Sequence, residues 1–167
     1  TLFRSDVIAV GKIFDIFDGE GVTEKIKTTG NTNGIAFTKA LQTRDFEGLA
    51  FVNLVDFDML YGHRRDVAGY AAAATEFDKF VADFIPGMRE GDILMVTADH
   101  GCDPSYTKTT DHTREYVPYL ICGKGVKPGV DLGTKLCFGT IAHTICDYLG
   151  VDASTLDGQS VLSDILA

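Results

Sequence analysis

Apolar and polar residues follow one another along this chain in blocks that predict strands and helices in turn. Four apolar runs are short enough to be buried strands: 6–13, 48–58, 91–99 and 117–125. Apolar residues at helical spacing predict helices over 31–43, 67–84, 139–150 and 159–166, the second stopped by Pro86 and Gly87. This order of elements indicates an α/β fold with a mainly parallel sheet flanked by helices.

Polar side chains stand where two of the predicted strands end. The run 48–58 finishes in Asp56 and Asp58, and the run 91–99 finishes in Asp99, which His100 follows. Ligands of open parallel sheets bind outside the carboxyl ends of the strands. The pattern therefore predicts a site at this edge of the sheet.

The net charge and the cysteine content limit the partners and the cellular compartment that we expect for this chain. The 167 residues are enough for one domain, and they carry a net charge of −9. Such an acidic chain disfavours nucleic acid and anionic membranes as partners, and it repels phosphorylated metabolites unless bound cations reverse the local field. The four cysteines show no CxxC spacing, and we expect reduced thiols and a cytoplasmic protein.

Two polar clusters hold three of the four histidines. The first is "VDFDMLYGHRRD", with Asp56, Asp58, His63 and Asp66. The second is residues 96–116, with Asp99, His100, Asp111 and His112. Imidazole together with carboxylate suits Mn²⁺, Zn²⁺ or Fe²⁺, whereas carboxylate alone suits Mg²⁺ or Ca²⁺. Each cluster by itself also fits a solvated polar loop, and their placement at neighbouring strand ends favours metal binding.

Four further residues have plainer interpretations. His143 lies inside an apolar helical pattern and is interpreted as a core histidine. Cys102 stands beside the candidate site, but no arrangement of a base and an orienting group singles it out, so we interpret it as an incidental thiol. Arg64 and Arg65 fit either solvated side chains or a pair that holds an anion, and the sequence leaves both readings open.

The blocks "NLVDFDMLYGHRRD", "TADHGCDPS", "TDHTREYVPYL" and "GKIFDIFDGEGVTE" resemble signature blocks of the phosphopentomutases, a family of the alkaline-phosphatase superfamily. The resemblance implies that residues 6–167 are the C-terminal portion of an alkaline-phosphatase-like core domain. The N-terminal core segment and the cap domain of that family have no counterpart in this chain. Residues 1–5 match nothing in the family, and we interpret them as a non-native remnant.

The resemblance also implies a site with two Mn²⁺ ions. Asp58, His63 and His112 resemble the ligands of one ion, and Asp99 and His100 resemble part of the shell of the other. In the family an N-terminal aspartate and a phosphorylated threonine complete the second shell. Neither has a match here, so no catalytic residue is assigned to this chain. We interpret Asp111 as a carboxylate that orients a neighbouring imidazole.

The implied reaction interconverts ribose 1-phosphate and ribose 5-phosphate, or the deoxyribose pair, through the phosphothreonine, with a sugar bisphosphate as activator. The partner is thus a small sugar phosphate, and the isolated chain is expected to be inactive as a mutase. Two alternatives remain. One is another metalloenzyme of the superfamily, such as a phosphoglycerate mutase or a phosphodiesterase. The other is a non-catalytic metal-binding module.

Overall fold

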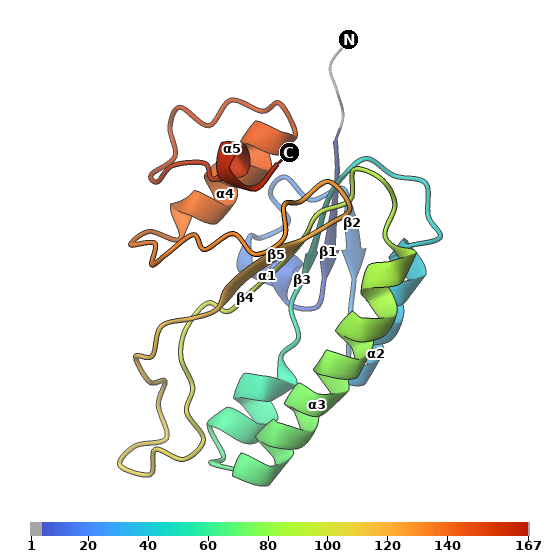
Figure 1. Cartoon of the computed structure of the whole chain (residues 1–167). Coiled ribbons are helices and arrows are strands. Elements are labelled where there is room, and N and C mark those ends of the chain that lie inside the picture. Colours follow the sequence, from blue (N-terminus) through green and yellow to red (C-terminus); the bar gives the residue numbers. More distant parts are fainter. Residues whose placement is uncertain (1–4, 167) are drawn as a thin grey trace. The chain divides into compact units, whose positions relative to one another are not determined.

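The computed structural model describes residues 5–166, which form two compact units (Figure 1). The first unit comprises the described residues up to Arg89 together with Met95–Leu120. The second comprises Glu90–Leu94 and the described residues from Ile121 onward. The interpretation of residues 1–5 as a remnant falls, apart from Ser5, outside the described part of the chain.

A three-stranded parallel sheet forms the centre of the first unit. Strand β1 (Asp6–Val10) lies between β2 (Glu24–Ile26) and β3 (Gly48–Val52), and both neighbours run parallel to it. Ile8 and Val10 are at most 1% exposed, and they pack with Leu41 into the core. The parallel sheet predicted from the sequence is confirmed.

Three details of the sheet differ from the prediction. The run 48–58 forms a strand only as far as Val52, and Phe51 is 43% exposed, so burial on both faces is wrong for β3. The reason is that β3 pairs within the described sheet only with β1 and lies at its edge. Strand β2 and the short helix α1 (Ile13–Ile16) were not predicted, because three or four residues show no readable period.

Two long helices of the first unit lie side by side (Figure 1). Helix α2 (Asn31–Leu41) packs against β1, and α3 (Val67–Phe84) packs against both α2 and the π-helix η1 (Phe57–Gly62). The carboxylate of Asp66 caps α3 by accepting the Gly69 N–H at 2.9 Å. A 3₁₀ turn, η2 (Ile85–Gly87), follows α3 at the predicted stop.

The remaining elements are shorter than the apolar runs that predicted them. Strands β4 (Leu94–Thr97) and β5 (Tyr119–Cys122) pair with each other in a two-stranded sheet. Helices α4 (Gly139–Tyr148) and α5 (Leu162–Ile165) pack together in the second unit, which confirms both predicted helices. Among the residues described, no helix combines the length and the apolar character that crossing a membrane requires.

Candidate metal centre

The π-helix η1 brings Asp58 and His63 to the same place. The wider turn of this helix closes with a hydrogen bond from the His63 backbone N–H to the Asp58 carbonyl oxygen, at 3.0 Å. The two side chains then meet, with Nε2 of His63 lying 3.2 Å from Oδ1 of Asp58. Short π-helical turns occur frequently at functional sites.

A closed loop after β4 supplies the other two histidines. The N–H of Thr113 donates to the carbonyl oxygen of Gly101 at 3.0 Å, and the N–H of Asp103 donates to Oγ1 of Thr113 at 2.7 Å. These bonds close the base of the loop. His100 and His112, on either side of that closure, stack with ring centroids 3.6 Å apart and planes 18° apart.

Three potential ligand atoms form a small triangle. Nε2 of His112 lies 3.1 Å from Nε2 of His63 and 3.4 Å from Oδ1 of Asp58, and the third side is the 3.2 Å contact between His63 and Asp58. Ligand bonds of about 2.1 Å separate neighbouring ligand atoms by about 3.0 Å at octahedral angles and about 3.4 Å at tetrahedral angles. The triangle therefore has the size of one face of a metal coordination shell.

The hydrogen bonding of the same atoms also fits a cation. Oδ1 of Asp58 is buried and accepts no hydrogen bond within the described structure. Nδ1 of His63 lies 2.5 Å from the carbonyl oxygen of Thr110, and since a carbonyl only accepts, Nδ1 is the donor; in the neutral imidazole Nε2 then presents a lone pair. A buried carboxylate oxygen without a donor is costly, and a divalent cation between these atoms would remove that cost.

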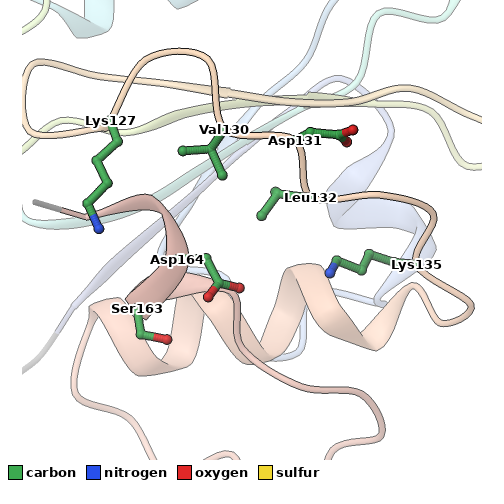
Figure 2. A pocket seen from close by; sticks show the side chains of 7 residues that line it. All are labelled: Lys127, Val130, Asp131, Leu132, Lys135, Ser163 and Asp164. Atoms are coloured by element: carbon green, nitrogen blue, oxygen red, sulfur yellow. The ribbon is translucent and has the colours of Figure 1, made fainter.

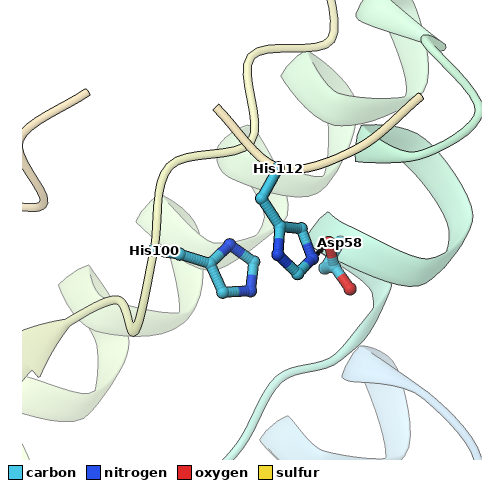
Figure 3. Close-up of side chains that lie close together, drawn as sticks. All are labelled: Asp58, His100 and His112. Atoms are coloured by element: carbon cyan, nitrogen blue, oxygen red, sulfur yellow. Dashed lines mark ion pairs between the residues drawn. The ribbon is translucent and has the colours of Figure 1, made fainter. Parts of the chain in front are cut away.

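His100 belongs to the same cluster, whereas Asp99 lies at its edge. Asp58, His100 and His112 each offer a ligand atom within 4.8 Å of the others, and Figure 3 shows the two rings next to each other with Asp58 reaching them from η1. Oδ1 of Asp99 is 3.6 Å from Nε2 of His100, and the Asp99 side chain is 81% exposed. The division of these residues between two metal ions stays a prediction.

The carboxylate of Asp111 contacts the backbone. Its Oδ1 accepts the backbone N–H of His112 at 2.8 Å and so helps to fix the loop. This contact differs from the expected role of Asp111, which was to orient an imidazole. For His63 that role falls to the carbonyl of Thr110. Sequence reasoning missed this partner because every residue has a carbonyl, and no residue type signals its use.

Asp56, a further carboxylate of the first cluster, is structural. Its Oδ2 accepts the N–H of Asn31 at 2.7 Å, and its own N–H donates to Oδ1 of Asn31 at 2.9 Å. This reciprocal pair caps the start of α2 and joins it to the segment after β3. Asp56 and Asp58, two positions apart, thus serve different purposes.

Cys102 lies against the cluster without a reactive environment. Burial, and then the neighbouring Asp58 carboxylate, raise the pKa of its thiol, which favours the protonated form. Its Sγ occupies the space beside Gly62, where a Cβ would overlap it. This geometry agrees with the interpretation of Cys102 as an incidental thiol.

The second unit has a pocket of about 550 Å³ that contains none of the predicted site residues (Figure 2). Its lining carries two lysines, two aspartates, a serine and two apolar residues: Lys127, Val130, Asp131, Leu132, Lys135, Ser163 and Asp164. The opposite charges balance, so the pocket favours neither an anion nor a cation.

Comparison with known proteins gives a consistent result. The chain is 53% identical to the phosphopentomutase of Acetivibrio thermocellus over 160 residues, which cover 96% of this chain and 41% of that protein. It is 52% identical over 160 residues to the phosphopentomutase of Lachnoclostridium phytofermentans, with 96% and 40% covered. For the phosphopentomutase of Anaeromyxobacter sp. the identity is 50% over 159 residues, with 95% and 40% covered.

The chain therefore spans about two fifths of the length of the curated relatives it matches. A family match described as the metalloenzyme superfamily extends over residues 4–153 and includes all the candidate ligands: Asp58, His63, Asp99, His100 and His112. By the extent of this match, the chain belongs to the metalloenzyme superfamily.

Proposed function

We propose that this chain is the C-terminal part of the core domain of a phosphopentomutase. The observation that carries the proposal is the 53% identity to the phosphopentomutase of Acetivibrio thermocellus over 96% of the chain. The convergence of Asp58, His63 and His112 supports it, because these residues offer the ligand atoms that a metal-dependent phosphoryl transfer requires.

The proposed reaction interconverts ribose 1-phosphate and ribose 5-phosphate, or their deoxyribose counterparts, with two Mn²⁺ ions. Asp58, His63 and His112 would hold one ion, and Asp99 and His100 would contribute to the other. When bound, the ions would offset the negative charge of the phosphoryl group and of this acidic chain. The carbonyl of Thr110 accepts the Nδ1 proton of His63, which leaves Nε2 directed at Asp58.

The proposed nucleophile is a threonine that is phosphorylated during turnover, in the portion of the relatives that this chain does not span. We propose a sugar bisphosphate as the activator that phosphorylates it, and the cytoplasm as the location of the whole protein. The chain by itself is then inactive as a mutase, although it holds most of the metal ligands.

A chimera tests the proposal directly. Residues 6–166 would replace the matching part of the phosphopentomutase of Acetivibrio thermocellus, and ³¹P NMR would follow ribose 1-phosphate and ribose 5-phosphate in the presence of Mn²⁺. We expect interconversion by the chimera and none by the isolated chain. His63→Ala should abolish the activity of the chimera, and His143→Ala should preserve it.

Circular dichroism and a cooperative melting curve would show that each chimera is folded. A folded chimera that binds Mn²⁺ but does not interconvert the two phosphates contradicts the proposed mutase. If it instead hydrolyses phosphodiesters or interconverts phosphoglycerates, another enzyme of the superfamily is the better assignment. Metal binding without any of these activities indicates a non-catalytic module.

A further inference from the structure

The guanidinium group of Arg65 is fully occupied by backbone carbonyls. Nε and Nη2 both donate to the Thr109 oxygen, at 2.9 and 2.5 Å, and Nη2 also donates to Asp111 at 2.6 Å. Nη1 donates to the oxygens of Gly62 and Asp103, at 3.1 and 3.0 Å. An arginine has five N–H donors, so no donor remains for a phosphate, and the anion-holding reading of Arg65 is wrong.

These carbonyls belong to the two segments that carry the candidate ligands. Gly62 ends η1 next to His63, and Thr109 and Asp111 precede His112 in the loop. Between Thr109 and Asp111 lies Thr110, whose carbonyl accepts Nδ1 of His63. Two side chains after η1 therefore engage three consecutive loop carbonyls.

The loop combines hydrogen bonds of its own with the contacts that Arg65 makes. Residues 103–111 contain turns but neither helix nor strand, and the carbonyls of Thr109 and Asp111 are bound by Arg65 from outside the loop. Arg65 itself has a φ of 56°, in the left-handed region that residues other than glycine rarely adopt. Such a conformation persists where surrounding contacts over-determine it, and the five hydrogen bonds of Arg65 do so here.

We infer that Arg65 is a positioning residue for the metal centre: it ties the loop to η1 and thereby sets the distance of His112 from Asp58 and His63. Its effect on a divalent cation passes through His112, since Arg65 is a cation and offers no lone pair as a ligand. The inference rests on one part of the proposed function, namely that Asp58, His63 and His112 bind a metal.

Mn²⁺ affinity, measured by isothermal titration calorimetry and by electron paramagnetic resonance of the free ion, tests this role. Loss of a group that orients a ligand typically weakens metal binding by about 10–100-fold, and we expect Arg65→Ala to fall in that range. Arg65→Lys keeps the charge but not the planar fork, so its affinity should lie between those of Arg65→Ala and wild type. Arg64→Ala, which removes an exposed neighbouring guanidinium, is the matched control and should bind like wild type.

A double-mutant cycle separates positioning from general stability. In a His112→Ala background, Arg65→Ala should weaken Mn²⁺ binding by less than twofold, because the residue through which Arg65 acts is already gone. A purely structural contribution would weaken binding equally in both backgrounds. The visible spectrum of the Co²⁺-loaded protein should lose the same ligand contribution in Arg65→Ala and in His112→Ala.

Each outcome is decisive. Equal losses in the two backgrounds, or unchanged affinity in Arg65→Ala, overturn the inference while leaving the metal site intact. Absence of Mn²⁺ binding in the wild-type protein overturns the metal site and the inference together. If Arg65→Ala does not fold, Arg65→Lys replaces it in the cycle, with the same distinction between unequal and equal losses.

Discussion

His63 and Thr110 are joined by a hydrogen bond that spans 47 positions of the sequence, from Nδ1 of the imidazole to the main-chain carbonyl oxygen, at 2.5 Å. The bond fixes the tautomer of His63 and leaves Nε2 facing Oδ1 of Asp58 at 3.2 Å. A backbone carbonyl thus performs the orienting role that a carboxylate performs in many metal sites.

This relationship predicts that the side chain at position 110 is dispensable. Thr110→Ala removes an exposed side chain and keeps the carbonyl, so Mn²⁺ affinity should stay within about twofold of wild type, well below the effect of losing an orienting group. Calorimetric titration with Mn²⁺ measures it. A tenfold loss in this variant would show that the Thr110 side chain, and not its carbonyl, supports the site.

Removal of either ligand from η1 should weaken the site so far that its ion is lost on dialysis. Asp58→Ala and His63→Ala each delete one corner of the triangle of ligand atoms, and we expect the bound Mn²⁺ to fall by one ion per chain. Elemental analysis after dialysis measures the stoichiometry. His143→Ala, which removes an imidazole from α4, should retain the wild-type amount. Equal retention in all three variants contradicts the assignment.

Substitutions of Asp56 and Asp58 should affect different properties: stability for Asp56 and metal binding for Asp58. Asp56→Ala leaves the first N–H of α2 without its acceptor, which should lower the free energy of unfolding by about 0.5–2 kcal/mol, typical for the loss of a helix cap. Denaturant unfolding measures the loss, and Mn²⁺ affinity should be unchanged. Asp56→Asn keeps an acceptor oxygen and should recover most of the stability. The prediction fails if Asp56→Ala loses the metal and keeps its stability.

Gly62 makes room for Cys102 beside Asp58. A Cβ at position 62 would overlap Sγ of Cys102 and lie 2.9 Å from the Phe57 carbonyl oxygen. Gly62→Ala should therefore destabilise the protein by about 1–3 kcal/mol, as overpacking does, and should weaken Mn²⁺ binding by moving η1.

Two variants control the Gly62 experiment. Adding Cys102→Ala to Gly62→Ala removes the sulfur and should recover part of the stability. Gly125→Ala places its new methyl group in open space, and it should leave the midpoint of thermal unfolding unchanged. A Gly62→Ala variant as stable as Gly125→Ala would show that the overlap with Cys102 is relieved without cost.

An ion pair of β2 predicts a small pH dependence of stability. Arg44 donates two hydrogen bonds to Glu24, at 2.9 and 2.6 Å, and these bonds hold the pKa of Glu24 below its ordinary value of 4.5. A carboxyl whose pKa is lower in the folded state stabilises the protein above the ordinary pKa. That contribution is lost as the pH falls through the lowered pKa.

Arg44→Gln should return the pKa of Glu24 toward its ordinary value, which a titration of the side-chain carboxyl carbon by NMR measures. The unfolding free energies of the variant and wild type should differ above pH 5 and converge as the pH falls below the lowered pKa. The difference should be small, because both side chains are about 40% exposed and solvent screens the pair. An unchanged pKa of Glu24 in the variant contradicts this account.

Much of the architecture was readable from the chain alone, for reasons that each element illustrates. Helix α3 matches its apolar spacing from Val67 to Phe84, because one face of a long helix repeats often enough to be recognised. The predicted strand continued to Asp58, whereas β3 ends at Val52. An apolar run shows hydrophobic content but does not show where strand pairing ends. Strand β2, with three residues, was too short to carry a period.

The sequence by itself determined the α/β class, the long helices and the two polar clusters that contain the candidate ligands, since these follow from residue type and local spacing. Only the tertiary structure decided which imidazole meets which carboxylate, that Asp56 caps α2, and that Arg65 holds the loop of His112. The physical reason is that these decisions run through backbone N–H and carbonyl groups, which every part of the chain has. Only the folded chain shows which of those groups are near enough to bond.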